Sequence, residues 1–289
     1  MALSGRSIAN PGPLTALRPT VVIVPGRIPL RQYARDLWHH RDLWWVLALR
    51  DLTLRYRQTA LGAVWVVLQP LLSAGILSFV FGRVADLPTD GVPSFVFTYA
   101  GMLAFGAFRD TLQRSSTSLV SNASLVAKIF FPRLVLPLSI VVAVLVDFCV
   151  GFVVALVLLF TNDLPPGPEL LLLPFWLLVV LMLAEGIGSF LGSFAARYRD
   201  FAHITPLLVQ LGLYASPVAY SVSAIPDQYL WIYYLNPFVA LLEAFRWSLL
   251  GTPFPSAGHL AYSMVITGIV FVVGLVTFEK RERMIADVI

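Results

Sequence analysis

The lysines are the first residues to test for chemistry, because a phosphate-binding P-loop needs a lysine directly after its glycine-rich turn. The chain has only two lysines, Lys128 and Lys280, and they follow Ala127 and Glu279. Neither position can form a P-loop. The sequence therefore predicts no nucleotide site in this chain, and any ATP-driven work requires a partner subunit.

The histidines do not complete a catalytic or metal-binding set. A nucleophilic membrane protease would need a serine and a histidine at the same depth, yet His203 and His259 fall near the ends of expected helices. His39 and His40 are adjacent, so their side chains point about 100° apart on a helix, and no acidic or cysteine partner has ligand spacing. We expect neither catalysis nor a metal site.

Two carboxylates, Asp147 and Glu185, lie within long apolar stretches and need an explanation. A charged side chain at the bilayer centre costs about 2.5–3.5 kcal/mol on insertion scales. Either residue could belong to a proton relay, or it could face the bundle interior, protonated or bonded to a neighbouring helix. No Lys, Arg or His lies on an adjacent turn to continue a relay, which favours the second interpretation.

Composition identifies the elements that must position these residues. The chain has 289 residues, of which 58% are hydrophobic and 12% charged, whereas soluble domains carry about 25% charged residues. The single cysteine, Cys149, cannot form an intrachain disulfide. These features predict an integral membrane protein.

Long apolar stretches predict an all-α integral membrane fold with six transmembrane helices. A further apolar region lies between the fifth and sixth of these helices. The six helices are expected near residues 61–82, 94–113, 134–160, 170–196, 203–222 and 258–278.

The basic residues set the orientation, because Lys and Arg accumulate in cytoplasmic loops. With these spans, 18 of the 20 basic residues fall on one side, and the other side keeps only Arg83 and Arg246. Both termini should therefore be cytoplasmic. The net charge of +4 reflects this topology rather than a surface for nucleic acid.

The segment before the first span divides into two parts. Residues 1–29 are rich in Pro and Gly and lack the apolar core of a signal peptide, which predicts a disordered cytoplasmic lead. Residues 30–56 place tryptophans on an apolar stripe with arginines elsewhere, as in an N-terminal amphipathic interfacial helix. This helix could simply anchor the first span or could transmit a signal. The transport domain would then occupy residues 57–289.

The outer stretch between the fifth and sixth spans is too apolar for a solvated loop. Pro226 and Pro237 each stand where a helix could begin, Asn236 is a candidate N-cap, and Gly251 ends the second piece. Each piece has roughly 10–14 residues, about half of a crossing. We expect two short re-entrant outer helices that form a gate, with Glu243 and Arg246 neutralising one another.

Two further patterns concern packing and a pathway. Small residues recur at spacing four in the fourth span, with Ser189 and Ser193 on the neighbouring stripe, which predicts close helix packing. In the first span Trp65, Gln69 and Ser73 share a face. This face could line a sugar pathway or belong to the core, and core packing is the better-supported alternative.

Four segments in order resemble one family. They are RDLTLRYRQTALGAVWVVLQPLL at 50–72, NASLVAKIFFPRLVLPLSIV at 122–141, RYRDFAHITPLLVQLGLYASPVAYSVSAIP at 197–226 and LNPFVALLEAFRWSLLG at 235–251. Together they resemble the type-2 ABC exporter permeases, most closely the polysaccharide, O-antigen and teichoic acid branch of the Wzm, KpsM and TagG group.

The resemblance implies a permease subunit in the bacterial inner membrane that exports a lipid-linked glycan. It further implies a homodimer, with each copy bound to a separate P-loop ATPase that holds ATP and Mg. The region that docks into the ATPase would include Asn122, Leu125, Lys128, Phe131 and Arg133. The outer gate would include Pro226, Asn236, Pro237, Glu243 and Arg246.

A glycan channel is expected to use aromatic faces, because sugars stack on rings through their apolar C–H faces. The channel-lining candidates are Trp65, Gln69, Tyr99, Phe105, Tyr214 and Tyr220. Two alternatives stay open: a type-2 ABC permease for a drug, lipid or other small molecule, and a membrane-embedded transferase, which the missing catalytic residues disfavour.

Overall fold

The computed structural model describes residues 41–57, 64–126, 128, 131–195, 197–198 and 200–285. Every regular element in these residues is a helix, which confirms the all-α prediction. The expected lead at 1–29, the first part of the interfacial helix, and the histidine pair at positions 39 and 40 lie outside the described residues.

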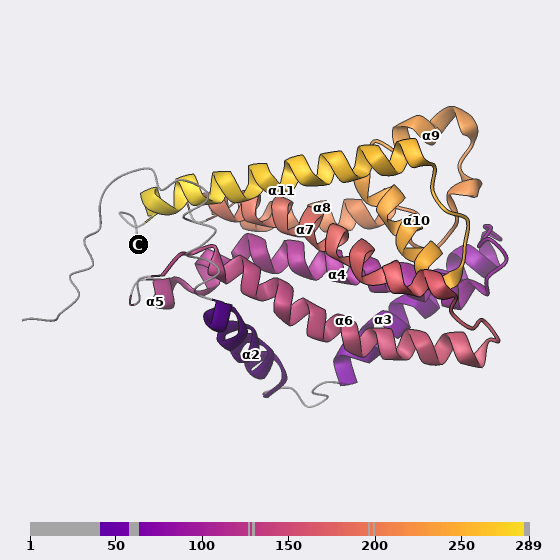
Figure 1. The fold of residues 1–289 in the computed structure, drawn as a ribbon, viewed down its shortest axis with the longest axis horizontal. Coiled ribbons are helices and arrows are strands. Elements are labelled where there is room, and N and C mark those ends of the chain that lie inside the picture. Colours follow the sequence, from indigo (N-terminus) through magenta and orange to yellow (C-terminus); the bar gives the residue numbers. More distant parts are fainter. Residues whose placement is uncertain are drawn as a thin grey trace, which may run out of the picture.

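The long helices lie roughly along one axis and form a bundle (Figure 1). They are α4 (Ser94–Ser121), α6 (Val135–Thr161), α7 (Leu173–Ala195) and α11 (Ala257–Ile285). Helix α7 packs against both α4 and α11. The short α5 (Ala123–Val126) and the end of α11 lie at one end of the bundle, and the connection between α6 and α7 lies at the other.

Within the described residues, four helices are long and apolar enough to cross a membrane. They are Val64–Val84, Val135–Thr161, Pro168–Ala195 and Ala257–Arg281, and they correspond to the first, third, fourth and sixth expected spans. The first of them combines α3 (Val64–Leu77), which contains Pro70, with a π-helical segment η1 (Ser78–Val84). The third begins with the 3₁₀ turn η2 (Pro168–Leu172).

The second and fifth expected spans differ from the other four. Helix α4 has 28 residues, which is ample length for a crossing, but it carries polar residues that are buried inside the bundle, among them Thr111, Ser115 and Ser118. Helix α8 (Phe201–Tyr214) has only 14 residues and contains Pro206, so the helix expected over 203–222 ends eight residues early. The chain continues from Ala215 to Tyr220 without helical structure, although most of this stretch is buried.

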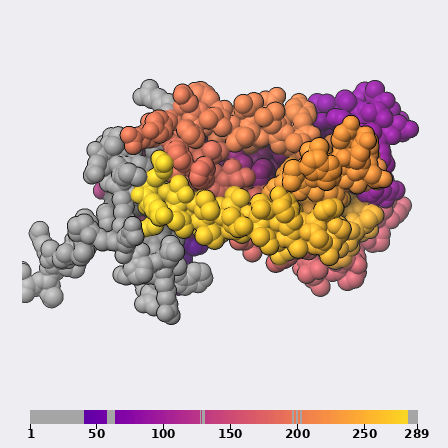
Figure 2. Space-filling model, turned by 90° about the horizontal axis from the view of Figure 1, so that it is seen from above, coloured from indigo at the N-terminus to yellow at the C-terminus, as the bar shows by residue number. Residues whose placement is uncertain are grey.

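The segment expected on the outer side forms two short helices, but the first, with 7 residues, is shorter than expected, whereas the second has 14. Helix α9 (Asp227–Tyr233) follows Pro226, and α10 (Pro237–Leu250) follows Asn236. The Asn236 side chain accepts a hydrogen bond from the backbone N–H of Phe238 at 3.1 Å, and Gly251 takes the left-handed conformation at the end of α10. Figure 2 shows α9 beside the start of α11 at one end of the molecule.

Small residues allow the helices around α7 to approach closely. A Cβ atom on Gly192 would lie 2.9 Å from the backbone oxygen of Ser115, and one on Gly186 would lie 2.7 Å from the backbone of Phe271. The first contact is with α4 and the second with α11. The Gly192 contact confirms the packing role predicted for the small-residue stripe, whereas Gly186 lies outside that stripe.

Two apolar clusters make up the core. The larger one joins α4, α6, α7 and α10, with Phe105, Leu181 and Phe245 almost fully buried. The smaller one joins α2 (Arg41–Arg57), α4, α6 and α11 at the end of the bundle that carries α5. Its buried members are Leu47, Leu119, Val126, Phe131, Leu134, Val135, Leu136 and Phe278.

Candidate functional site

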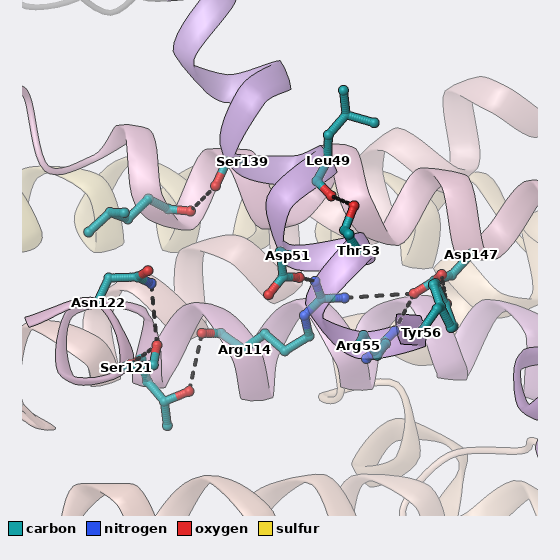
Figure 3. A network of polar contacts seen from close by, with 12 residues as sticks. Leu49, Asp51, Thr53, Arg55, Tyr56, Arg114, Ser121, Asn122, Ser139 and Asp147 are labelled. Carbon is teal, nitrogen blue, oxygen red and sulfur yellow. Dashed lines mark hydrogen bonds and ion pairs between the residues drawn. The ribbon is translucent and has the colours of Figure 1, made fainter. Parts of the chain in front are cut away.

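Helix α2 is attached to the bundle through a polar network centred on Asp147 (Figure 3). Asp147 stands near the middle of α6, and its side chain is only 12% exposed. Arg55 donates a hydrogen bond to its carboxylate at 2.5 Å, and the hydroxyl of Tyr56 donates another. Of the two interpretations of Asp147, bonding to a neighbouring helix is the one that the structure shows.

Arg114 extends this network one turn along the same face of α2, to Asp51. Its guanidinium lies 3.7 Å from the carboxylate of Asp147 and also donates a hydrogen bond to Asp51. Thus one arginine of α4 connects carboxylates of α2 and α6. Arg55 and Arg114 could not be predicted from residues within one turn of Asp147, because both come from other helices.

Burial changes the titration of the tyrosine in this network. Burial, and then the hydrogen bond to the Asp147 carboxylate, raise the pKa of Tyr56 to about 12. The phenol therefore stays protonated at neutral pH and remains a hydrogen-bond donor.

Helix α2 extends from the smaller core cluster, at one end of the bundle, to the middle of α6. Leu47 packs in the smaller core cluster, whereas Arg55 and Tyr56 reach the middle of α6. Trp45, expected on the apolar stripe, is 54% exposed, so α2 presents apolar residues on its outward face too. Such a helix is suited to a position between the bundle and lipid.

The region expected to dock into an ATPase lies beside the start of α2. Arg50 donates a hydrogen bond to the side chain of Asn122 at 2.9 Å. Phe131 is buried in the smaller core cluster and Leu125 packs against it. Lys128 is exposed and Arg133 is half-buried. The apolar members of the set therefore anchor this turn, and Lys128 points its charge to the surface.

Two of the residues expected at an outer gate, Asn236 and Arg246, bond to the non-helical stretch that follows α8. Asn236 donates hydrogen bonds to the backbone oxygen of Ala215 at 3.1 Å and to the hydroxyl of Ser216 at 3.0 Å. The hydroxyls of Tyr220 and Tyr233 are 2.7 Å apart. These contacts hold α9, α10 and the chain after α8 to one another.

In the described part of the chain, no direct ion pair joins Glu243 to Arg246, although their charges still attract one another as expected. Arg246 is buried and donates hydrogen bonds to the backbone oxygens of Pro217 and Val218, at 2.6 and 2.5 Å. Glu243 instead accepts a hydrogen bond from the hydroxyl of Tyr234 at 3.0 Å. Because these two oxygens lie outside any helix, they accept the hydrogen bonds of the guanidinium, a contact that helical spacing cannot reveal.

The channel-lining candidates do not meet in one place. Trp65 and Gln69 line a pocket between α2, α3, α4 and α6. Phe105 belongs to the core, and Tyr99 is buried and donates a hydrogen bond to the backbone oxygen of Gly151. Tyr214 is 64% exposed at the end of α8, and Tyr220 is engaged with Tyr233 as described above.

Glu185 lies buried between α4 and α7. Its two carboxylate oxygens are bonded to the hydroxyls of Ser115 and Ser189, at 2.6 and 2.7 Å. The second carboxylate that needed an explanation is thus bonded to a neighbouring helix as well.

The comparisons with known proteins agree with this architecture. Residues 42–250 match the family described as ABC-2 type transporter. The chain is similar to the O-antigen export system permease protein RfbA of Klebsiella pneumoniae, with 28% identity over 86% of this chain and 95% of that protein. RfbA of Myxococcus xanthus shows 28% identity over 88% and 97% of the two chains. The polysialic acid transport protein KpsM of Escherichia coli shows 25% identity over 82% and 92%.

Proposed function

This chain belongs to the ABC-2 type transporter family, as a multi-pass membrane permease and not the ATPase, and we propose that it exports a lipid-linked polysaccharide across the bacterial inner membrane. The observation that carries the proposal is similarity over nearly the full length of permeases named for O-antigen export and polysialic acid transport. The similarity extends through α9 and α10, the segment that we assign to the outer gate.

Two copies of the chain and two ATPase subunits would form the exporter. Binding of ATP and Mg would fall to the partner, because neither Lys128 nor Lys280 follows a glycine-rich loop. The turn from Asn122 to Arg133 would contact that partner. Its apolar residues are anchored in the smaller core cluster, so a force on the turn would reach α2, α6 and α11 together.

Each copy would cross the membrane six times, with both termini in the cytoplasm. Four crossings would use the apolar helices. A fifth crossing, by α4, is supported by its 28 residues and by the burial of its polar side chains. The remaining crossing would combine α8 with the non-helical stretch to Tyr220, which is tolerable at membrane depth because it is buried in protein.

Two experiments test the proposal. The first depletes the protein and measures glycan in the cytoplasm. The second purifies the chain and determines whether an ATPase co-purifies with it. Export of a lipid-linked polymer predicts that the polymer accumulates inside the cell. Drug sensitivity without polymer accumulation would support a small-molecule exporter of the same family instead. A chain that purifies without any P-loop ATPase would contradict both.

A further inference from the structure

A pocket of about 480 Å³ opens where the end of α2 meets α3, α4 and α6. This volume lies within the range of about 300–1,000 Å³ that is typical of small-molecule sites. Trp65, Gln69 and Ser73 of α3 form one wall, and Gly106 and Gln113 of α4 contribute to another. The pocket lies within a single copy of the chain, so its lining does not depend on a second subunit.

The lining combines apolar side chains with several polar ones, although the pocket lies beside the middle of α6. Asp147 and Gly151 of α6 line it together with Arg109 and Asp110 of α4. Polar side chains are kept at membrane depth where they face water, a polar ligand or each other. The mixture of amides, charged groups and apolar side chains therefore suits an occupant with both apolar faces and polar edges better than a lipid tail.

The charges of the lining cancel. Arg55 is paired with Asp147 at 2.5 Å, and Arg109 is paired with Asp110 at 2.8 Å. Among the described lining residues, two arginines and two aspartates thus leave no net charge for an anionic or cationic ligand. Guanidinium groups only donate hydrogen bonds and carboxylates only accept them, so each pair can bind a hydroxyl group in both of its roles.

The ring of Trp65 completes the site, because its side chain is half-exposed and lines the same pocket. A flat apolar face beside amides and paired charges suits a sugar ring, because such a ring is apolar on its C–H faces and carries hydroxyl groups at its edge. We propose that this pocket is a binding subsite for an uncharged sugar unit of the exported glycan. The assignment rests on the proposed function and adds a preference for neutral over acidic sugars.

Gly106 offers a direct way to block the pocket. No atom lies within 4 Å of a Cβ built on Gly106, so Gly106→Leu can place its side chain in the open space without clashing with the backbone. Gly268 of α11 is equally unobstructed and is not part of the lining. Gly268→Leu is therefore a matched control for the added bulk.

The test uses the full-length permease with its ATPase partner in lipid nanodiscs and measures saturation-transfer NMR signals from two probes. One probe is the neutral trisaccharide mannotriose, and the other is a trimer of sialic acid, which carries a carboxylate on each unit. We expect mannotriose to bind the wild type and Gly268→Leu, and to bind Gly106→Leu and Trp65→Leu at least about tenfold more weakly. Trp65→Phe keeps a flat ring and should bind more tightly than Trp65→Leu.

Three outcomes would overturn the subsite: no mannotriose binding to the wild type, equal binding by Gly106→Leu, or equally tight binding of the sialic acid trimer. The depletion experiment separates this failure from failure of the proposed function. If polymer accumulates on depletion but Gly106→Leu binds mannotriose and exports polymer normally, only the subsite is wrong. If no polymer accumulates, the proposed function is wrong as well.

Discussion

The guanidinium group of Arg246 lies 3.9 Å from the centroid of the Phe97 ring. This contact places a buried charge of α10 between an aromatic ring of α4 and the backbone oxygens of Pro217 and Val218. A cation–π contact and two charge-assisted hydrogen bonds act on the same group. Arg246 thereby joins α10, α4 and the non-helical stretch after α8.

Arg246→Leu should destabilise this junction. Each lost hydrogen bond to a charged donor costs about 1.5–3 kcal/mol, and the backbone oxygens would remain buried without it. We expect a lower thermal unfolding midpoint and faster proteolysis between Ala215 and Tyr220. Arg246→Lys keeps the charge but not the planar fork, so it should lie between the wild type and Arg246→Leu. Equal thermal unfolding midpoints for Arg246→Leu and the wild type would show that Arg246 does not stabilise this junction.

Asp147→Asn should loosen α2 from the bundle. The substitution removes the charge that attracts Arg55 and Arg114 while keeping the shape of the side chain. Because Arg55 is 39% exposed, solvent screening limits the loss to about 1–2 kcal/mol. Hydrogen exchange of the α2 amides should accelerate. Asp42→Asn is the control, since that side chain is 95% exposed, and unchanged exchange in Asp147→Asn would show that apolar packing alone holds α2.

The attachment of α2 should also weaken at high pH. The pKa of Tyr56 is raised from 10.0 in the unfolded chain to about 12 in the folded protein, so folding favours the protonated phenol. Its contribution to stability is complete below pH 10 and falls as the pH rises toward about 12. The Tyr56→Phe variant should lack this pH-dependent contribution when hydrogen exchange of its α2 amides is compared with that of the wild type across this pH range. Identical pH profiles would contradict it.

Gly192→Ala should separate α7 from α4. The new Cβ would lie 2.9 Å from the backbone oxygen of Ser115, and backbone atoms cannot move aside as a flexible side chain can. Gly268→Ala meets no atom within 4 Å, and alanine favours helix by up to about 1 kcal/mol over glycine. Thermal unfolding in detergent should therefore shift down for the first variant and stay level or rise for the second. A shift of the same sign in both would show that the glycine contact is unimportant.

Charge reversal at the proposed ATPase contact should uncouple hydrolysis from transport. Lys128→Glu and Arg133→Glu change the charge of the turn after α5 without touching the buried Phe131. We expect the complex to hydrolyse ATP with reduced glycan export. Arg83→Glu, at the exposed end of η1, gives the same charge change away from this turn and should export normally. Coupled turnover in the first two variants would place the contact elsewhere.

Local patterns predicted those features that depend on nearby residues in the chain. The N-cap at Asn236, the proline at the start of α10 and the left-handed Gly251 follow from rules of helix ends. The close packing at Gly192 follows from a spacing of four along one helix. By contrast, helical spacing predicted that Glu243 and Arg246 pair with one another. In the structure Glu243 accepts a hydrogen bond from Tyr234, 9 positions away, and Arg246 donates one to Pro217, 29 positions away.

By itself, the sequence determined that this chain is a helical membrane protein without a P-loop, because hydropathy and the absence of a suitably placed lysine are properties of composition and order. Only the tertiary structure decided which polar groups meet. Asp51, Arg114 and Asp147 come from three helices, and the carbonyls, the ring and the guanidinium at Arg246 come from the non-helical stretch after α8, from α4 and from α10. In a protein interior each buried polar group must find a partner, and that partner is set by helix packing rather than by distance along the chain.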